Sequence, residues 1–237
     1  AKPIPTHLSS YMLPGGLYLT VYVGDLMISG PSGLHDSFWR KLNKYVKLEA
    51  PEELDRFLGR DHKVTTQDSG ARRVLYDMRS YAEQTVKHYV DITKRTHLRS
   101  ASTPFVPEGA VAEEDDAVGG ELQEHATSCL MKALWLARLG RPDMLRPITY
   151  LATRVQRWTR GDDKRLLRAI SYLNTTTNYV LTGTCADPAE QLHLELYVDA
   201  DYAGGEDGTR STSGAWLVLR GPNTSLPITC LLYTSDA

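Results

Sequence analysis

Three carboxylates at two places in the sequence could take part in metal-dependent chemistry. Asp25 follows the apolar stretch LYLTVYV and Gly24, a pattern typical of a β-hairpin with an aspartate at its tip. Asp199 and Asp201 follow residues in which apolar and polar side chains alternate, so a strand would carry both carboxylates at its end. Carboxylates held in this way can bind Mg²⁺ ions that neutralise phosphate oxygens. Each signal is weak alone, because Gly-Asp is also an ordinary turn pair.

The aspartate pair after a strand has a second interpretation. Haloacid-dehalogenase-like phosphatases open with such a pair, and the first aspartate, here Asp199, would be the nucleophile. These enzymes also need a lysine and a further acidic pair downstream. No lysine follows Lys164, and the carboxylates that remain after Asp201 are Glu206, Asp207 and Asp236. A phosphatase is therefore the third alternative.

Composition predicts a globular protein. The 237 residues are 41% hydrophobic and 24% charged, enough for one large or two small units with apolar cores. Cys129, Cys185 and Cys230 are far apart and form no CxxC pair, so neither a disulfide framework nor a zinc site is predicted. No apolar run approaches the roughly 18 residues of a membrane span, and the first residues form no targeting signal. We therefore expect no membrane partner.

Charge is distributed unevenly, although the net charge is only -2. The stretch EGAVAEEDDAVGGELQE, residues 108–124, contains acidic residues and no Lys or Arg, which predicts a flexible acidic linker over 106–126. The region after it is locally cationic. Arg154, Arg157 and Arg160 would lie on one side of a helix, as in a solvated basic face.

Periodicity indicates the elements that hold these residues. Leu17 to Ser29 is typical of the hairpin, and Ser32 could cap a helix with apolar residues from Leu34 to Val46. Apolar residues at helical spacing predict four further helices, at 82–90, at 128–139, from near Arg146 and from near Asp162. Pro147 sets the start of the third of these. Period-two stretches at 192–198 and 215–219 predict strands.

Six motifs, in order along the chain, resemble the Pol polyprotein of copia-type LTR retrotransposons. Tyr22-Val-Gly-Asp25 resembles the YVDD box of reverse transcriptases, and Tyr197 to Ala203 with Ser211 to Gly214 resembles the YSDADWAG…STSG opening of RNase H. The other four segments that resemble this family are Leu54–His62, Ser102–Pro104, Leu134–Asp143 and Leu166–Leu173. Together the six cover most of the chain.

The resemblance implies an α+β fold with a definite order of parts. Residues 1–105 would form a partial reverse transcriptase palm hairpin with helices from the palm and thumb region, and 106–126 the acidic linker. Residues 127–183 would form a helical connection, and 184–237 a truncated RNase H-like mixed sheet. The last residues, Cys230–Ala237, resemble translated sequencing-adapter sequence instead.

The resemblance also implies an activity. The parent polyprotein would perform RNA-directed DNA polymerisation and RNA–DNA hybrid cleavage, with Mg²⁺ as cofactor and with Asp25 and Asp199 as catalytic metal ligands. Its partners would be an RNA–DNA hybrid or template–primer duplex and the remainder of the Pol polyprotein. Arg154, Arg157 and Arg160 could then follow the phosphate backbone of the duplex, although a solvated basic face fits them equally well. The family works in cytoplasmic particles, and its DNA product enters the nucleus.

Departures from the family pattern bear on activity. Gly24 stands where the motif has its first metal-binding aspartate, the chain starts just before the hairpin, and it ends before the later RNase H acids. One carboxylate cannot hold two metal ions. We therefore expect a fragment that is inactive alone. The alternative is a remnant that binds nucleic acid without catalysis.

Overall fold

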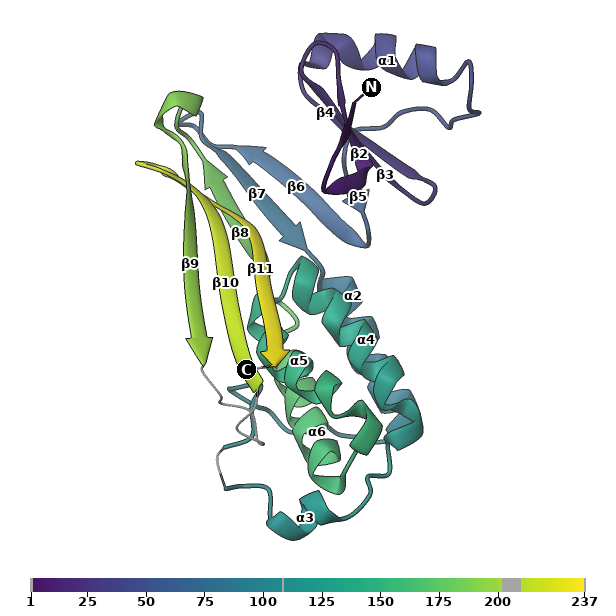
Figure 1. Ribbon diagram of the computed structural model, residues 1–237, viewed down its shortest axis with the longest axis vertical. Coiled ribbons are helices and arrows are strands. Elements are labelled where there is room, and N and C mark those ends of the chain that lie inside the picture. The colour runs from purple at the N-terminus through teal and green to yellow at the C-terminus, as the bar shows by residue number, and fades with distance from the viewer. Residues whose placement is uncertain (1, 108, 202–209, 237) are drawn as a thin grey trace. The chain divides into compact units, whose positions relative to one another are not determined.

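The computed structural model describes residues 2–107, 109–201 and 210–236, and the chain divides into two compact units, Ala1–Leu58 and Gly59–Ala237. Both helices and antiparallel sheets are present, so the α+β class is confirmed (Figure 1). The division differs from the boundary expected near residue 105. Residues 60–105 belong to the second unit because their strands and helix pack against later strands and helices.

The first unit is an antiparallel sheet followed by a helix. Its strands pair in the order β1-β2-β3-β4, and Leu17 and Leu19 of β3 are its buried apolar residues. The elements are β1 (Lys2–Ile4), β2 (His7–Leu13), β3 (Leu17–Tyr22), β4 (Asp25–Ser29), the 3-10 turn η1 (Ser32–Leu34), α1 (His35–Leu42) and β5 (Arg56–Phe57).

The predicted hairpin over Leu17–Ser29 is confirmed, with its turn one residue earlier than expected. Tyr22 pairs with Asp25, so Val23 and Gly24 form a two-residue turn and Asp25 begins β4. The predicted cap of the next helix is wrong. Ser32 begins η1 and makes no capping side-chain bond, and α1 begins only at His35.

The second unit contains a larger antiparallel sheet, in the order β6-β7-β8-β11-β10-β9. Pairing of β7 with β8 brings together residues about a hundred positions apart, which local periodicity could not indicate. The strand predicted at 192–198 is confirmed as part of β9, which begins one residue later at His193, and the strand predicted at 215–219 lies within β10. The strands are β6 (Arg60–Thr66), β7 (Arg72–Asp77), β8 (Leu181–Cys185), β9 (His193–Asp201), β10 (Arg210–Gly221) and β11 (Thr224–Asp236).

Helices of the second unit gather beside one end of this sheet (Figure 1). They are α2 (Arg79–Thr93), α3 (Glu113–Ala117), α4 (Gln123–Leu139), α5 (Leu145–Thr153) and α6 (Arg160–Thr175), with short 3-10 turns η2 (Pro142–Met144), η3 (Val155–Arg157) and η4 (Ala189–Gln191). Leu130, Leu136, Ile148 and Leu166 are fully buried where α4, α5 and α6 meet. In the described ranges, every helix is too short or too polar to span a membrane.

The predicted starts of the last two helices are confirmed. Pro147 lies in the first turn of α5, where its missing N–H costs no helical hydrogen bond. At α6 the side chain of Thr159 accepts from the Asp162 N–H, and the Asp162 carboxylate accepts from the Thr159 N–H, a capping box.

Candidate functional site

Asp25 lies beside a strained turn in the first unit. Val23 has a φ of 52° and is 95% exposed, and Asp25 is also exposed. A β-branched side chain in this left-handed region is a conformational outlier, held here by the pairing of the two flanking strands. The hairpin therefore presents the Asp25 carboxylate at a fixed position in solvent.

Asp199 lies on β9, the edge strand of the described sheet in the second unit. It pairs with Gly214 of β10, and its side chain is exposed. The side chain of Asp201, two residues further on, lies outside the described residues. The strand thus carries Asp199 as the sequence predicted, and no contact of its carboxylate is described.

The described residues do not bring together a metal-binding set. Within the described ranges, no group of three or more His, Cys, Asp or Glu side chains is close enough to hold a metal ion. Asp25 and Asp199 belong to different units. Because a two-metal centre needs several carboxylates around both ions, the described residues do not by themselves make up the Mg²⁺ centre that the resemblance implies.

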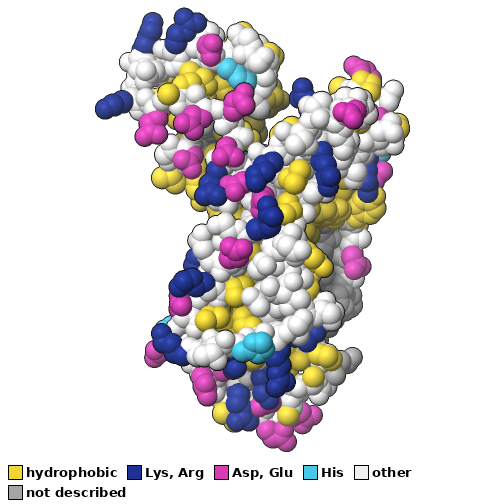
Figure 2. Space-filling view, turned by 180° about the vertical axis from the view of Figure 1, so that it is seen from behind, with side chains coloured by type: hydrophobic (Ala, Val, Ile, Leu, Met, Phe, Trp, Pro, Cys, Tyr) yellow, Lys and Arg dark blue, Asp and Glu magenta, His cyan; other side chains and the backbone are white. Residues whose placement is uncertain are grey.

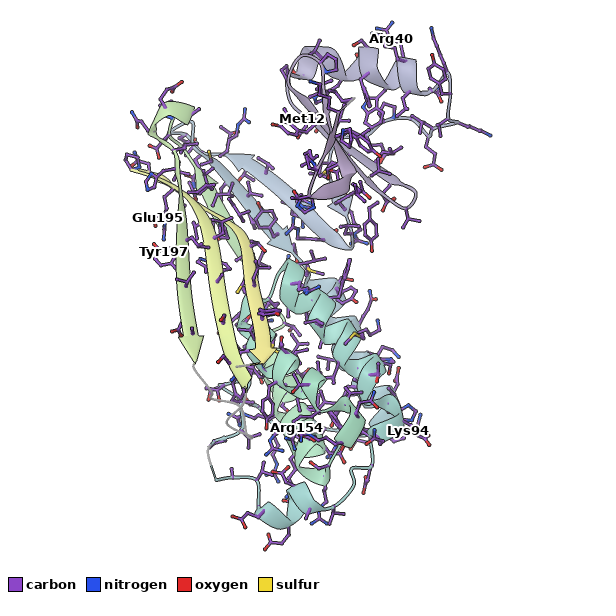
Figure 3. The ribbon with its side chains drawn as sticks, viewed as in Figure 1. Met12, Arg40, Lys94, Arg154, Glu195 and Tyr197 are labelled. Carbon is purple, nitrogen blue, oxygen red and sulfur yellow. The ribbon has the colours of Figure 1, made fainter. Side chains whose placement is uncertain are left out.

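Arg154, predicted to contact phosphates, lies inside the second unit instead. Its Nε donates to Oδ1 of Asp162 over 2.6 Å, and the two residues are 5% and 0% exposed. Arg165 also donates to Asp162, over 3.2 Å. In Figure 3 Arg154 lies among the helices. A buried guanidinium that is paired in this way is not accessible to a nucleic acid.

Arg160 and Arg157 lie nearer the surface. The Nε of Arg160 donates to Oδ1 of Asp115 over 2.6 Å, and Lys164 donates to the other oxygen of the same carboxylate. These contacts, the bond from Lys164 first, hold the pKa of Asp115 below its usual range although burial opposes the shift. Arg157 is exposed at the end of η3. The three arginines therefore do not form one open cationic face.

Residues 113–122 pack against α6, where a flexible linker was expected. We call Asp115 and Asp116 of α3, with the α6 cations that they bind, the α3 clasp. Asp116 accepts from both terminal nitrogens of Arg165, over 2.6 and 2.7 Å. Its carboxylate lies so close to α6 that a Cβ on Gly161 would be 2.1 Å from Oδ1. The opposite charges of 113–116 and 154–168 were visible in the sequence, but not their proximity.

Charge on the surface reflects this pairing. Figure 2 shows Lys and Arg side chains beside Asp and Glu side chains at the end of the unit that holds α3. Gly120 donates to the Trp158 carbonyl over 3.1 Å and Arg160 donates to the Val118 carbonyl over 2.8 Å, so the backbone of the acidic segment is also bound. The acidic segment thus neutralises the start of α6.

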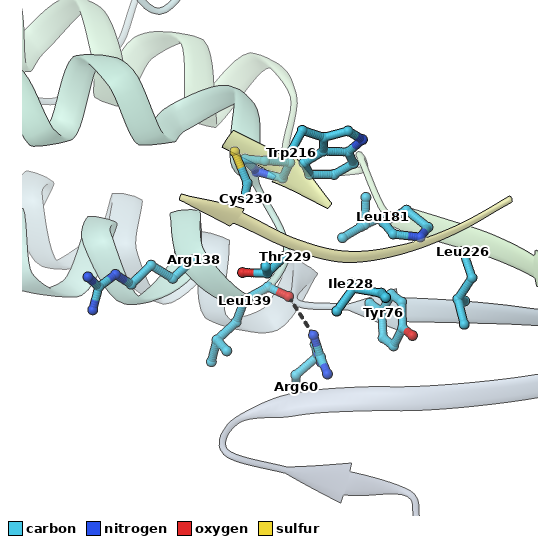
Figure 4. A pocket seen from close by; sticks show the side chains of 12 residues that line it. Arg60, Tyr76, Arg138, Leu139, Leu181, Trp216, Leu226, Ile228, Thr229 and Cys230 are labelled. Atoms are coloured by element: carbon cyan, nitrogen blue, oxygen red, sulfur yellow. Dashed lines mark hydrogen bonds between the residues drawn. The ribbon is translucent and has the colours of Figure 1, made fainter. Parts of the chain in front are cut away.

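A cavity of about 190 Å³ lies between the end of α4 and the sheet of the second unit (Figure 4). Arg60, in its wall, donates to the carbonyl of Leu139 over 3.0 Å and lies 4.3 Å from the ring centre of Tyr76. Burial lowers the pKa of Arg60. Arg60 caps the carboxyl end of α4, where the helix dipole favours a cation. No carboxylate is among the described residues that line the cavity, so Asp199 is not in its wall.

Over most of its length the chain is related to retrotransposon Pol proteins, which confirms the resemblance seen in the motifs. It is 24% identical to a transposon Ty5-1 protein of Saccharomyces cerevisiae over 87% of this chain and 64% of that protein. It is 26% identical to a retrovirus-related Pol polyprotein from transposon RE1 of Arabidopsis thaliana, over 84% of this chain and 13% of that protein. The chain therefore spans less than two thirds of either relative.

The other comparisons add no relative. No model of a known protein family matches the chain. No solved structure matches it either.

Proposed function

We propose that the chain is part of the reverse transcriptase and RNase H region of a copia-type retrotransposon Pol polyprotein, and that it does not catalyse either reaction alone. The β3–β4 hairpin carries this proposal. Its strained two-residue turn coincides with the YVGD motif and holds Asp25 at the start of β4. The relationship to Pol proteins supports it.

In the parent protein, Asp25 and Asp199 would each contribute one carboxylate to a Mg²⁺ site completed by other residues. An RNA–DNA hybrid or template–primer duplex would be the substrate, and cytoplasmic particles the site of action. Gly24 supplies no ligand at the position where the family has an aspartate. Polymerisation should therefore be impaired more than hybrid cleavage, because a missing carboxylate leaves a metal ion underbound.

The test compares this chain with a longer product of the same reading frame. The 237-residue chain should not cleave a labelled RNA–DNA hybrid in Mg²⁺ or Mn²⁺. The longer product should cleave it, and Asp199→Asn should abolish the cleavage. Restoring Gly24→Asp in the longer product should raise primer extension. Cleavage by the 237-residue chain that is lost in Asp199→Asn would contradict inactivity, and a longer product that is unaffected by Asp199→Asn would contradict the proposed role of that residue.

A second candidate function is binding of nucleic acid without catalysis. Exposed cations in the loop that follows α2 favour this function. They belong to no described ion pair with a carboxylate and lie outside the α3 clasp.

A further inference from the structure

The loop that follows α2 is the least neutralised cationic segment near the helices of the second unit. Four exposed side chains can carry positive charge within six residues, and we call them the cationic loop: Lys94, Arg95, His97 and Arg99. None of them belongs to an ion pair described within 4 Å, whereas Arg154, Arg160, Lys164 and Arg165 all do.

Acidic groups near the cationic loop offset only part of its charge. Asp91, one turn earlier on α2, binds Lys87 over 2.6 Å, and this bond first, with the nearby charge of Lys94, lowers the pKa of the Asp91 carboxyl. Asp163 accepts hydrogen bonds from neutral donors only among those described, so it keeps its negative charge. Lys94 and Arg95 also complement the carboxyl end of α2, but a helix end supplies only about half a charge. The cations of the loop therefore outnumber the described carboxylates near them.

The loop is held in place from both sides. Lys94 ends α2 in the left-handed conformation, with a φ of 53°, and Leu98 packs against the apolar core. After the loop, the N–H of Ala101 donates to Oγ1 of Thr175 over 3.1 Å, and Arg168 donates to the backbone carbonyl of Thr103 over 2.8 Å. Arg168 adds a further cation from α6 beside the loop. In Figure 3 Lys94 lies at the outer edge of the helices, unlike Arg154.

We infer that the cationic loop binds the phosphodiester backbone of a nucleic acid, in place of the Arg154–Arg160 face. This inference rests on the proposed relationship to nucleic-acid enzymes and names a contact surface for it. Lys and Arg side chains, with the hydroxyl of Thr96 between them and that of Ser100 directly after Arg99, are the groups that contact phosphates without distinguishing bases. An anionic membrane is the weaker alternative, because Leu98 is turned into the core and the loop exposes no apolar side chain for a bilayer.

Fluorescence anisotropy with a labelled 20-base-pair RNA–DNA hybrid, titrated between 50 and 300 mM NaCl, tests the inference. Each phosphate contact contributes roughly 0.7 to 0.9 to the slope of log K against log salt. The double variant Lys94→Gln/Arg99→Gln removes two such contacts and should reduce this slope by about 1.4 to 1.8. The matched control Arg72→Gln/Arg73→Gln removes the same charge from exposed positions on β7 and should leave the slope unchanged. Thermal unfolding checks that both variants fold.

Three outcomes would overturn the inference. The first is an equal decrease of the salt slope in both double variants. The second is no hybrid binding by the unmodified chain at 50 mM NaCl, and the third is binding to phosphatidylserine vesicles but not to the hybrid. None of them bears on the proposed parent activity, because that is decided by Asp199→Asn in the longer product.

Discussion

Arg154 and Asp162 form a buried ion pair, with Nε 2.6 Å from Oδ1, that joins the end of α5 to the first turn of α6. The other oxygen of Asp162 accepts from the backbone N–H of Thr159, over 3.1 Å, as part of the capping box. A single carboxylate therefore fixes both the start of a helix and the position of a buried cation. This explains why an arginine in a cationic sequence segment has a structural role.

Removing one partner of this pair should destabilise the second unit. Among the described residues, Arg154→Met leaves the buried Asp162 carboxylate with only Arg165 as a cationic partner. We therefore expect a loss of about 3 kcal/mol in the free energy of unfolding. Arg146→Met is the control, since Arg146 is exposed on α5 and should change stability by less than about 0.5 kcal/mol. Urea unfolding followed by circular dichroism measures both. An equal loss in the free energy of unfolding for Arg154→Met and Arg146→Met would contradict the buried pair.

Asp116 of the α3 clasp lies close to Gly161 of α6, and this gives a second prediction. A methyl group at position 161 would displace the Asp116 carboxylate from Arg165, so Gly161→Ala should cost about 2 kcal/mol although alanine favours helices. Gly119→Ala is the matched control because its Cβ would meet no atom within 4 Å, and it should cost nothing. The comparison is made by thermal unfolding. A stabilised Gly161→Ala variant would show that the acidic segment does not pack there.

The sequence predicted single helices and strands better than it predicted which of them pair or pack together. Helices α2, α4 and α6 followed from apolar spacing, and so did the start of α6 near Asp162. Strands β6, β7 and β8 escaped prediction because their short segments have no clear alternation, and their pairing depends on residues far along the chain. Arg154, Arg157 and Arg160 were interpreted as a nucleic-acid face. Sequence alone does not reveal that Arg154 pairs with Asp162 and that Arg160 pairs with Asp115.

Asp77 should make stability depend on pH in the acidic range. Hydrogen bonds from the Arg79 side chain, stronger than the opposing effect of burial, lower the pKa of Asp77 to about 2. A carboxyl whose pKa is lower in the folded state adds stability above its unfolded pKa of about 3.9, and loses it as pH falls toward 2. Asp77→Asn should therefore cost about 1 to 2 kcal/mol at pH 7, after allowance for the exposure of Arg79.

The same variant should lose less stability than the unmodified chain between pH 4 and pH 2, because its side chain does not titrate. Asp115 and Asp116, whose pKa values are also lowered, should keep part of the pH dependence. Asp68→Asn, at an exposed turn position between β6 and β7, is the control and should lose as much stability as the unmodified chain. Unfolding by urea at pH 7, 4, 3 and 2 gives the comparison. If the unmodified chain and Asp77→Asn lose stability in parallel on acidification, Asp77 is not the responsible group.

The hairpin turn of the first unit should become more stable when its strain is removed. Val23 is too exposed to contribute packing, and relief of its left-handed backbone outweighs the entropy cost of glycine, so Val23→Gly should gain about 0.5 to 1 kcal/mol. Val21→Gly, within β3, should instead lose about 1 kcal/mol. Hydrogen exchange of the β3–β4 amides measures local stability. Slower exchange in Val23→Gly is the expected result, and faster exchange would exclude strain at the turn.

The open edge of β9 should promote self-association of the chain. In the described sheet β9 has a neighbour on one side only, and Leu194, Leu196 and Val198 are 62%, 61% and 73% exposed. Such an edge can pair with another strand, and a lysine on it opposes that pairing. Leu196→Lys should therefore lower the apparent mass in concentrated samples measured by size-exclusion chromatography with light scattering. Leu54→Lys makes the same change at an exposed position outside any strand, and an equal decrease there would show that added charge alone is responsible.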